Sequence, residues 1–530
     1  MTDASFRGRH RTFRRARRLA ACVLAITLAS SASGCLAGDE LAVSSDAGDE
    51  PAFQFAQTRA GLGIFAAGGD PEAFAPDGAQ CNLARKVQIS YVGPDLDHFE
   101  EFGFGNLVIE NPWRMISAYL TELNAAGGIN GRCVQASVHS VDWNDPDAQY
   151  VKVCRSITSL DPEPVAVISL FGDARGVECI AAEAQIPMLG LHSSVPATVQ
   201  RQSGGRLFLD DGTSGHLLGH SIVTARDFDV VATVDQLGLL YGPPVGTDTT
   251  AEDYNIGADF AEIAEIAEAP SSIPGVISHV PARFGDLALL PLERETRLLE
   301  TGLTPSEQFG AQAQIAEITD VDDLRLLSDI ENFYLTEARK HRDSGVRAVF
   351  SAAPWFELRR MMLAAERIGW YPRWIANDAQ NPTLVLPGLP SSQTENFFLV
   401  SSRPAVGDEP SALDRGCVAT RQAAPGAEAF NFRPYSDAWI LLVATCDALD
   451  VVMSALSRVD GAPTPGAVAE MLAVAQDDAG TETRLAFGPG DYSGAERFRV
   501  LRANFDCGLN PWGCMRAVSG WRQTSAVADR

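Results

Sequence analysis

The sequence lacks the short motifs that mark the common catalytic sites. It contains no GxSxG around a nucleophilic serine, no HExxH pair of zinc ligands, and no CxxC or CxxH spacing. No cysteine has the local context of a nucleophile with a histidine base, and no spaced pair of carboxylates can be placed. Without such a set of residues, we expect no enzyme, no catalytic residue and no cofactor.

Two weaker patterns for metal binding have simpler explanations. His216 and His220 stand four residues apart on an expected helix, but no glutamate and no third ligand accompany them, so a surface or core pair is favoured. The stretch DVDD (320–323) lacks the glycine and glutamate of a calcium loop. It stands at an expected helix start, where aspartate interacts favourably with the helix dipole. We predict no metal site.

Positive charge is scarce outside the N-terminus. The chain carries 42 Lys plus Arg against 68 Asp plus Glu, a net charge of −26. Residues 1–34 hold seven of the arginines and one aspartate, so the remainder has 35 basic and 67 acidic side chains and a net charge of −32. Nucleic acids and anionic lipid surfaces attract proteins of the opposite sign. We therefore expect neither as a partner.

The N-terminal arginines precede a short apolar segment that leads to a cysteine. Residues 7–18 hold the seven arginines, the uncharged LAACVLAITLAS follows, and SASGC comes next. The apolar segment is too short for a membrane span, and a short buried helix is the weaker explanation. The order resembles a bacterial lipoprotein signal peptide, with Ala32 where the lipobox usually has leucine. This resemblance implies cleavage after residue 34, lipidation of Cys35, and an exported protein held at the cell envelope by its lipid alone.

Eight further cysteines remain once Cys22 and Cys35 are set aside. An even number in an exported protein favours disulfides over metal ligation. Cys507 and Cys514 enclose a short loop that contains Pro511, and we predict that they form a disulfide. The sequence does not determine how the other six are paired.

Composition separates a linker from the folded part of the chain. Residues 35–80 are rich in alanine, glycine and acidic side chains without clear periodicity, which is typical of a flexible acidic linker. About 450 residues follow. That length is too great for one ordinary core and is enough for two lobes.

Expected strands alternate with expected helices from residue 87 onward. Asn111-Pro112 provides an N-cap and a first-turn proline, and Trp113, Ile116 and Leu120 then recur at helical spacing. Such alternation predicts right-handed βαβ crossovers and a parallel sheet. The expected strands of this first series are 87–92, 133–141, 165–172 and 186–190, and a further helix is expected to begin at Asp145-Pro146.

A second series of the same kind begins near residue 213. Leu358, Met361 and Met362 recur at helical spacing, so the methionines indicate core packing and not a ligand site. A long apolar helix is expected at about 436–457, followed by closing strands in RFRVLRANFDCG. The expected strands of this series are DVVATV (229–234), RAVFSAA (347–353), WIAND (374–378) and FFLVSS (397–402).

The glycine-rich stretch LNAAGGINGRC (123–133) raises the question of a phosphate site. A phosphate loop places its glycines after a strand and before a helix, so that the N-terminus of the helix meets the anion. Here Gly127 and Gly128 follow an expected helix, and Asn130-Gly131 precedes an expected strand. These residues suit a left-handed helix stop and a turn. We predict that the loop is a connector.

The same loop resembles a segment of a known family. NAAGGINGR matches the Asn-x-x-Gly-Gly-Ile-x-Gly segment of periplasmic solute-binding proteins of the branched-chain amino acid (Leu/Ile/Val) ABC transporter type. The ordered series of matches, more than any one of them, carries the resemblance. The other matching stretches are YVGP (91–94), SVDWNDPDAQ (140–149), VAVISLFGD (165–173), AEAQIPMLGLHSS (182–194), LLYG (239–242), GVRAVFSAAPWFELRRMMLAAERIGW (345–370) and AFGPGDYSG (486–494).

The resemblance implies an α/β fold of the type I periplasmic binding protein class, in which two Rossmann-like lobes with parallel sheets are joined by a hinge. Two crossings of the chain, near residues 210 and 402, would form that hinge. The implied organisation is a lipoprotein signal peptide (1–34), an acidic linker (35–80), lobe 1 (81–212 with 403–485), lobe 2 (213–402, with an unusual insertion at about 246–325), and closing strands with a C-terminal disulfide loop (486–530).

Ligands of open α/β folds bind outside the carboxyl ends of the strands. Asp378 follows an expected strand and aligns with the acidic residue that receives the ligand amino group in amino-acid-binding relatives, although an exposed loop aspartate is the simpler alternative. Ser193 and Ser194 are equally well explained as ordinary helix caps. The expected ligand-binding residues are Asp173, Ala174, His192, Ser193 and Ser194 from lobe 1, with Tyr241, Trp355 and Asp378 from lobe 2 and Tyr435 as a weaker candidate near the hinge.

The function implied by the resemblance is reversible capture of a small polar solute, such as an amino acid or an amide, between the two lobes. The loaded protein would deliver the solute to an ABC permease. The alternative is a lipoprotein of the same fold that acts as a sensor or regulator of a cell-envelope enzyme through protein contact. The long stretch at 246–325 and the lack of serines in the loop FGDARG (171–176) favour this alternative slightly.

Overall fold

The computed structural model describes most of the chain after residue 80. The expected signal peptide, Cys35 and the acidic linker lie outside the described residues. The described residues are 80–94, 112–141, 146–170, 174–192, 195–232, 235–242, 256–266, 275–281, 321–380, 385–386, 389–423, 430, 432–474, 485, 487, 492–495, 497–504 and 513–523.

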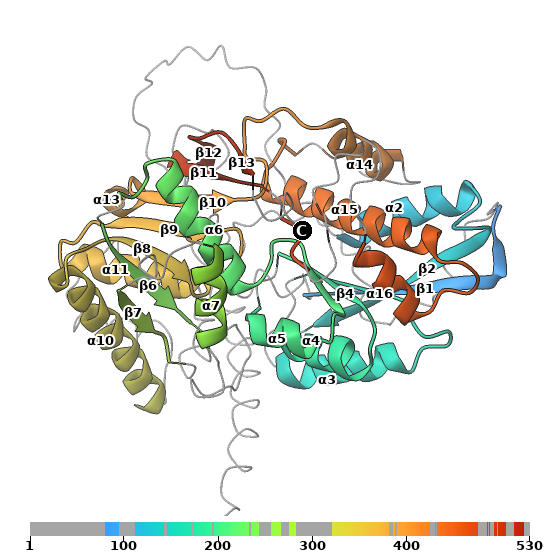
Figure 1. The fold of residues 1–530 in the computed structure, drawn as a ribbon, viewed down its shortest axis with the longest axis horizontal. Coiled ribbons are helices and arrows are strands. Elements are labelled where there is room, and N and C mark those ends of the chain that lie inside the picture. The colour runs from blue at the N-terminus through green and yellow to red at the C-terminus, as the bar shows by residue number, and fades with distance from the viewer. Residues whose placement is uncertain are drawn as a thin grey trace, which may run out of the picture. The chain divides into compact units, whose positions relative to one another are not determined.

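The first of two sheets is entirely parallel, with strand order β2-β1-β3-β4-β5. Figure 1 labels β1, β2 and β4 of this sheet. Helices follow its strands, as the alternating pattern predicts. We call this sheet with its helices lobe 1. Its first elements are β1 (Asn82–Pro94), α2 (Pro112–Ala125), β2 (Arg132–Val141), α3 (Pro146–Thr158), β3 (Val167–Leu170), α4 (Ala174–Val177), the π-helical segment η4 (Glu178–Glu183), β4 (Met188–Leu191), α5 (Ala197–Gln202) and β5 (Leu207–Leu209); α14 (Ala412–Ala423), α15 (Asp437–Arg458) and α16 (Pro465–Leu472) return to it later.

The second sheet has the order β12-β11-β10-β9-β8-β6-β7, with β13 paired to β11. It is parallel from β7 to β10 and antiparallel at the closing strands. We call this sheet with its helices lobe 2. Its elements are α6 (Ser214–Asp227), β6 (Gln236–Tyr241), α7 (Ile256–Ile266), β7 (Val276–His279), α10 (Val321–Asp343), β8 (Val346–Ala352), α11 (Trp355–Arg367), β9 (Arg373–Asn377), α13 (Ser391–Thr394), β10 (Phe397–Ser401), β11 (Arg497–Asn504), β12 (Cys514–Ala517) and β13 (Arg522–Gln523).

Both faces of each sheet are covered by helices. In β6, Leu239 and Tyr241 pack with residues of α6 and α7, whereas Leu240 between them packs with residues of α10 and α11. In β1, Tyr91 packs with α2 and α15, while the adjacent Val92 packs with the layer that contains α3. Successive side chains of a strand point to opposite faces, so these runs are apolar on both sides. Polar functional groups are therefore expected at the ends of the strands.

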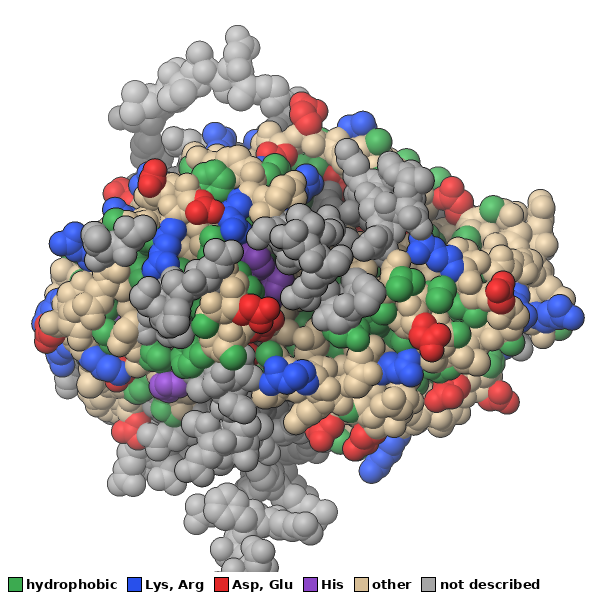
Figure 2. Space-filling model, viewed as in Figure 1, with side chains coloured by type: hydrophobic (Ala, Val, Ile, Leu, Met, Phe, Trp, Pro, Cys, Tyr) green, Lys and Arg blue, Asp and Glu red, His purple; other side chains and the backbone are tan. Residues whose placement is uncertain are grey.

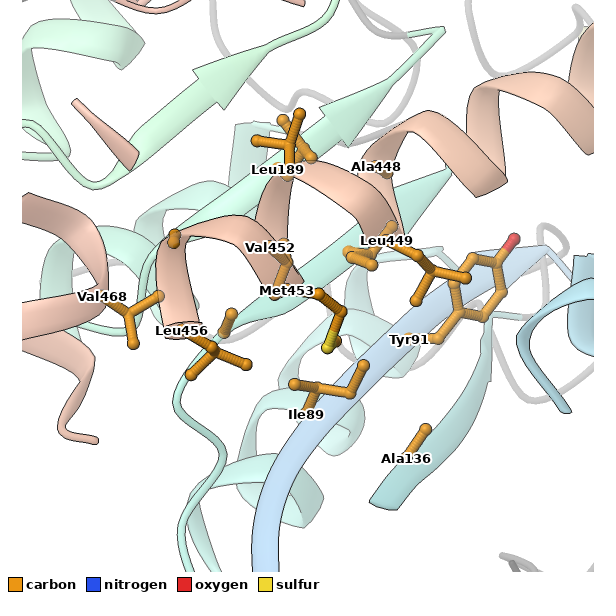
Figure 3. Close-up of a cluster of buried hydrophobic side chains, with 14 of the residues drawn as sticks. Ile89, Tyr91, Ala136, Leu189, Ala448, Leu449, Val452, Met453, Leu456 and Val468 are labelled. Carbon is orange, nitrogen blue, oxygen red and sulfur yellow. The ribbon is translucent and has the colours of Figure 1, made fainter. Parts of the chain in front are cut away.

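The long helix α15 forms the core of lobe 1. Figure 3 shows Leu449 and Met453 pointing toward Tyr91 and Ile89 of the sheet. Within the described residues, α15 is the one helix with the length and apolar composition of a membrane span, and 72 % of that apolar window is buried. Its composition is therefore explained by its position in the core.

One predicted strand, DVVATV (229–234), is wrong. Helix α6 runs to Asp227, and the Val230 N–H donates to the Ala225 carbonyl at 2.8 Å, so the chain is still closing the helix at this point. Val230 and Val231 are buried because they pack in the core of lobe 2. The strand begins later, at Gln236, and contains the sequence LLY.

The stretch at 246–325 contains ordinary elements of lobe 2. Helix α7 and strand β7 lie within it, and β7 pairs in parallel with β6 at the edge of the sheet. These elements continue the strand–helix alternation of the sheet. Residues 282–320 lie outside the described part of the chain.

The glycine-rich loop between α2 and β2 is a connector, as predicted. Gly127, Gly128, Asn130 and Gly131 all have positive φ values, of 106°, 68°, 50° and 75°. A Cβ atom on Gly128 would lie 2.0 Å from the Arg132 carbonyl oxygen. The loop therefore depends on glycine for its backbone conformation and for space, and it joins the end of a helix to the start of a strand.

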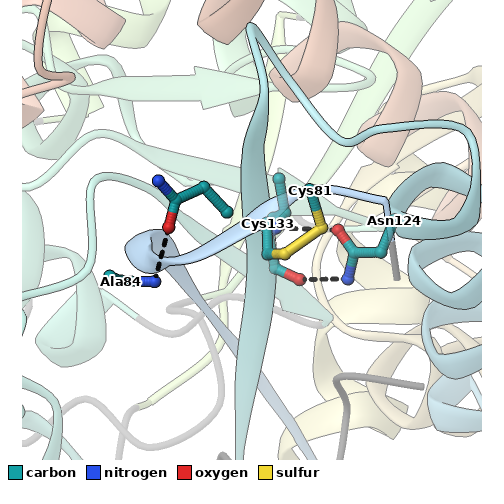
Figure 4. Close-up of a disulfide and its surroundings, with 6 residues drawn as sticks. Cys81, Ala84, Asn124 and Cys133 are labelled. Carbon is teal, nitrogen blue, oxygen red and sulfur yellow. Dashed lines mark hydrogen bonds between the residues drawn. A yellow bond between two sulfur atoms is a disulfide. The ribbon is translucent and has the colours of Figure 1, made fainter. Parts of the chain in front are cut away.

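Three disulfides connect elements within lobe 1. Figure 4 shows Cys81–Cys133 beside Asn124, whose side chain bonds to the backbone of Val134. The disulfide joins Cys81, which directly precedes β1, to Cys133 of β2. Cys514 is also disulfide-bonded, and its predicted partner Cys507 lies outside the described residues. The other two pairs are Cys154–Cys179, between α3 and η4, and Cys417–Cys446, between α14 and α15.

The described chain passes between the lobes at three places. The first crossing is 210–213, from β5 to α6, and the second is 402–411, from β10 to α14. The third, 492–495, runs beside the first: the Leu209 N–H donates to the Tyr492 carbonyl, and the Gly494 N–H donates to the Leu209 carbonyl. The sequence predicts the first two and misses the third.

Candidate functional site

The residues expected at the strand ends of lobe 1 are only partly described. Ala174 is the first residue of α4. His192 directly follows β4. Asp173, Ser193 and Ser194 lie outside the described residues. Of the five residues expected from lobe 1, His192 is the one whose side chain the structure describes.

His192 is held in an unusual conformation by an aspartate of the first crossing. Its φ of 51° is uncommon for a residue with a side chain. Its backbone N–H donates to both carboxylate oxygens of Asp210, at 3.1 and 3.0 Å. Its ring contacts the guanidinium of Arg403, with 3.1 Å between Nη1 and Nε2. The end of β4 is therefore attached to both of the first two crossings.

Arg403 joins those two crossings through ion pairs. Its Nη2 donates to Asp210 Oδ2 at 2.8 Å and to Asp211 Oδ2 at 2.5 Å. The exposed fractions of the three side chains are 13 %, 6 % and 1 %. Because the aspartates precede lobe 2 and the arginine precedes the return to lobe 1, these pairs hold the crossings side by side.

Asp378 joins the same network from lobe 2. It directly follows β9, and its carboxylate accepts hydrogen bonds from Ser401 Oγ at 2.6 Å, Ser402 N at 2.6 Å and Ser402 Oγ at 2.9 Å. Ser402 Oγ also lies 3.2 Å from Asp211 Oδ1. We call His192, Asp210, Asp211, Asp378, Ser402 and Arg403 the crossing cluster.

The crossing cluster has more negative than positive charge. Three carboxylates surround one guanidinium. Burial raises the pKa of Asp211 well above the usual value and also raises the pKa of Asp210, although Arg403 opposes both shifts. Burial and the Arg403 charge together lower the pKa of His192, so its imidazole is neutral. The cluster is therefore suited to take up a proton or a further cationic group.

Exposed charges contribute little by comparison. On the face in Figure 2, acidic and basic side chains of the described residues are interspersed. Arg347 and Arg373, for example, both approach Asp235, with side chains that are 77 % and 44 % exposed. Pairs of this kind contribute about 0–1 kcal/mol. Larger electrostatic effects are expected at buried pairs such as those of the crossing cluster.

The two aromatic residues expected in the site from lobe 2 pack against protein. Tyr241 ends β6 in the core of lobe 2, and its hydroxyl donates to Asp259 Oδ2 at 2.6 Å. Trp355 begins α11, is partly buried, and meets Phe356 edge to face with 5.5 Å between ring centroids. Neither belongs to the crossing cluster.

Tyr435 lies in a different part of lobe 1. Its hydroxyl donates to Asp414 Oδ2 at 2.6 Å, and its ring packs with Trp439 in a cluster that includes Cys417 and Cys446. Its φ is 61°. These contacts connect the loop before α15 to α14.

The candidate metal ligands are otherwise engaged. His216 and His220 lie on α6, and His220 is buried and stacks on Phe498 of β11 with 4.7 Å between ring centroids, so this pair packs in the core of lobe 2. Within the described residues, Cys417, Cys446 and Asp450 have ligand atoms within 4.8 Å of one another. Those two cysteines form a disulfide, which removes the thiolates that a metal would need.

The structure thus brings His192 and Asp378 into one network and adds four residues that sequence reasoning misses, namely Asp210, Asp211, Ser402 and Arg403. Arg403 directly follows the predicted strand 397–402, so the rule that ligands bind at the carboxyl ends of strands could have identified it. Asp210 and Asp211 follow β5, a strand of three residues. So short a strand has too few positions for its periodicity to be recognised.

Comparisons with known proteins identify the fold. No protein-family model matches the chain, and no curated protein does. Among solved structures, an extracellular ligand-binding receptor from Verminephrobacter eiseniae matches with a TM-score of 0.52 at 13 % identity, covering 79 % of this chain and 98 % of that one. The chain has the type I periplasmic binding protein fold.

Two further structures of this fold were solved with ligands. An ABC transporter substrate-binding protein from Desulfitobacterium hafniense in complex with Leu has a TM-score of 0.50 at 13 % identity, covering 82 % of this chain and all of that one. A solute-binding protein of an ABC transporter from Rhodopseudomonas palustris BisB5, in complex with 3,4-dihydroxybenzoic acid, has a TM-score of 0.50 at 11 % identity, covering 83 % and 98 %. At identities this low, the structural similarity supports the fold alone.

Proposed function

We propose that the protein is an extracytoplasmic solute-binding lipoprotein, which captures a small polar solute between its lobes and delivers it to an ABC permease. The observation that supports this most strongly is the position of His192 and Asp378. They follow strands of different lobes and meet at the crossings, on the strand-end side where open α/β folds bind ligands.

The crossings would serve as the hinge. A ligand favours the closed form only through contacts that it makes better there than in the open form. Arg403, Asp210 and Asp211 lie on the crossings themselves. A solute that bonds to residues of the crossing cluster from both lobes would therefore favour closure directly.

The solute class follows from the charge of the cluster. The cluster has three carboxyl groups and one guanidinium, so acceptor oxygens outnumber the cation and a cationic or donor group on the solute would be stabilised near Asp378. An amino acid, an amide or a similar molecule provides such a group. The neighbours of this fold bound leucine and an aromatic acid, which supports a small organic solute.

The remaining parts of the proposal come from the N-terminus and the lack of reactive residues. Lipidation of Cys35 would place the protein at the cell envelope, with the lipid as its contact with the membrane. The sequence contains none of the catalytic motifs GxSxG, HExxH and CxxC. Reversible binding without a chemical reaction is the activity proposed.

The second candidate is a sensor or regulator of a cell-envelope enzyme that acts through protein contact. The observation that favours it is the internal pairing of the cluster, because Asp378 bonds to Ser401 and Ser402 and Arg403 bonds to Asp210 and Asp211. Groups that already have partners gain less from a solute.

A thermal-shift screen of the mature chain with amino acids, amides, polyamines and short peptides would separate the two. We expect a saturable rise in Tm, since a ligand at 100 times its Kd stabilises the folded state by about 2.7 kcal/mol. No shift with any class, together with co-purification of a membrane enzyme, would favour the regulator.

With a solute in hand, calorimetry of Asp378→Asn tests the site. Loss of the negative charge should weaken binding of a cationic solute at least tenfold, which corresponds to about 1.4 kcal/mol. Asp235→Asn is a control, since Asp235 pairs with Arg347 and Arg373 and bonds to the backbone of Ala232, none of which belongs to the crossing cluster. Unchanged affinity for Asp378→Asn would remove Asp378 from the site.

A further inference from the structure

Helix α7 of lobe 2 contacts lobe 1 through a buried carboxylate. The backbone N–H of Ala197, at the start of α5, donates to Asp259 Oδ1 at 2.9 Å. The Tyr241 hydroxyl of lobe 2 donates to Asp259 Oδ2 at 2.6 Å. Asp259 is only 1 % exposed. A single carboxylate therefore links the two lobes directly.

A second carboxylate of α7 reaches the first crossing. Thr213 Oγ1 donates to Glu262 Oε2 at 2.5 Å, and it accepts the N–H of His216 as the N-cap of α6. Burial raises the pKa of both Asp259 and Glu262, and the positive charge of Arg201, on α5, opposes these shifts because it attracts both carboxylates. Lobe 1 thus faces α7 with an N–H donor and a cation.

Close packing of α6 and α7 transmits any movement of this contact to the hinge. A Cβ atom on Gly215 would lie 2.6 Å from Glu262 Oε2 and 3.0 Å from Asp259 Cα, and one on Gly219 would lie 3.0 Å from Ile266 Cβ. Helices that approach so closely move together. Since α6 begins where the first crossing ends, α7 is coupled to the crossing.

We propose that Asp259 and Glu262 form an interlobe clasp, which holds α7 of lobe 2 against lobe 1 when no solute is bound and which opens to admit one. Helix α5 follows the carboxyl end of β4, and α7 follows that of β6. The clasp therefore lies on the side where the solute is expected. The role of a solute in this proposal rests on the proposed function, whereas the contact between α7 and lobe 1 is a property of the chain alone.

The clasp would regulate affinity. Because the proposed solute favours the closed form, the apparent Kd equals the intrinsic Kd divided by the fraction of molecules that are closed without solute. A variant that lowers this fraction from about nine in ten to about one in ten thus weakens binding about ninefold. Weakening the clasp should therefore weaken solute binding without any change in the residues that touch the solute.

The charges around the clasp make it sensitive to pH. Besides each other, Asp259 and Glu262 face Arg201 from α5, Tyr241 from β6 and Glu265 from α7, while α6 presents Gly215. Burial raises the pKa of Asp259 and raises that of Glu262 to about 7. Opening returns the carboxylates to water, where their pKa values fall toward the usual range.

The sign of the effect follows from proton linkage. The closed form binds protons more tightly than the open form, so acid favours closure and a rise in pH through about 7 favours opening. For each proton released, the ratio of closed to open molecules falls by at most tenfold per pH unit.

Two measurements on the mature chain without solute test the clasp. Small-angle X-ray scattering gives the radius of gyration, and hydrogen exchange, corrected for the intrinsic effect of pH, gives the protection of the Ala197 amide. Wild type should be more compact and better protected at pH 5.5 than at pH 8. Asp259→Ala should be expanded at both values, with at least tenfold faster exchange at Ala197.

Neutral variants and a matched control complete the test. Glu262→Gln should stay compact and lose most of the pH dependence, because it cannot ionise. Glu470→Gln makes the same charge change at an exposed position of α16, outside the groups that face the clasp, and should keep the pH dependence. Should Asp259→Ala fail to fold, Asp259→Asn, which retains an acceptor for Ala197, should remain compact up to pH 8.

The clasp is refuted if Asp259→Ala leaves both the radius of gyration and the Ala197 protection unchanged, or if Glu262→Gln keeps the full pH dependence. Neither result depends on a solute. If the protein binds solute but Asp259→Ala changes neither the radius of gyration nor the Ala197 protection, the clasp is contradicted and the proposed function is not. If Asp259→Ala changes both quantities as expected but the protein binds no solute, the proposed function is contradicted and the clasp is not.

Discussion

At the scale of single residues, the crossing cluster depends on one arginine. Taking two carboxylates out of water is costly, and an opposing charge with hydrogen bonds is what makes it tolerable. Arg403 provides this for Asp210 and Asp211 and also contacts the ring of His192. The aspartates raise the pKa of Arg403 despite its burial, so it remains charged at any pH at which the protein is folded.

We expect Arg403→Gln to destabilise the protein severely. It leaves two buried carboxylates without their cation, which costs about 3–5 kcal/mol. Arg347→Gln, at an arginine that is 77 % exposed and 4.0 Å from its partner, should change stability by less than about 0.5 kcal/mol. Urea unfolding at pH 7 measures both free energies. Equal effects of the two variants would show that the cluster has no special energetic role.

The loss of unfolding free energy caused by Arg403→Gln should become smaller as the pH falls. The pKa values of Asp210 and Asp211 are already raised in the folded protein, and loss of the cation raises them further. The folded state therefore binds more protons than the unfolded state. Its stability rises as the pH falls through the folded pKa values toward about 3.9, the value for an unfolded aspartate. Unfolding of variant and wild type at pH 5 and pH 7 gives the comparison.

At the scale of elements, short connections fix how each helix meets the next strand. Gly128 and Gly131 share the loop between α2 and β2 and have similar φ values. They differ in their surroundings, because a Cβ on Gly128 would meet the Arg132 carbonyl whereas one on Gly131 would meet nothing within 4 Å.

This pair separates backbone strain from steric contact. Gly131→Ala should cost about 1 kcal/mol, for the left-handed backbone alone. Gly128→Ala should cost at least about 1–3 kcal/mol more, because the loop has to move to relieve the contact. Thermal and urea unfolding of the two variants measure the difference. Similar losses of stability in both would contradict the steric argument.

The same scale shows why some elements were predictable. Strands with buried faces on both sides and helices with one apolar stripe carry their pattern locally. DVVATV misled the prediction because burial in a helix-ending turn selects the same apolar residues as a strand does. Strand β5 was missed because Leu207–Leu209 is too short to have a pattern.

At the scale of the whole molecule, disulfides reinforce lobe 1. The pair Cys417–Cys446 attaches α14 to the central helix α15. Residues 29 apart are connected by this bond, and closing a loop of that size restricts the unfolded chain by about 3 kcal/mol.

We therefore expect the double variant Cys417→Ser and Cys446→Ser to lose about 3 kcal/mol of stability. If the lobes unfold separately, the loss should appear in the transition of lobe 1, because the bond lies wholly within that lobe. Differential scanning calorimetry resolves the transitions. A loss confined to the transition of lobe 2 would contradict this placement.

The sequence by itself determined the α/β alternation, the two-lobed organisation and two of the residues in the crossing cluster, His192 and Asp378. These follow from local patterns, since a strand end is visible wherever an apolar run stops. Only the tertiary structure decided that Arg403 pairs with Asp210 and Asp211, and that Asp259 reaches Ala197. Charge pairing depends on distance and burial in space, and residues far apart in the chain acquire both only when the crossings bring the lobes together.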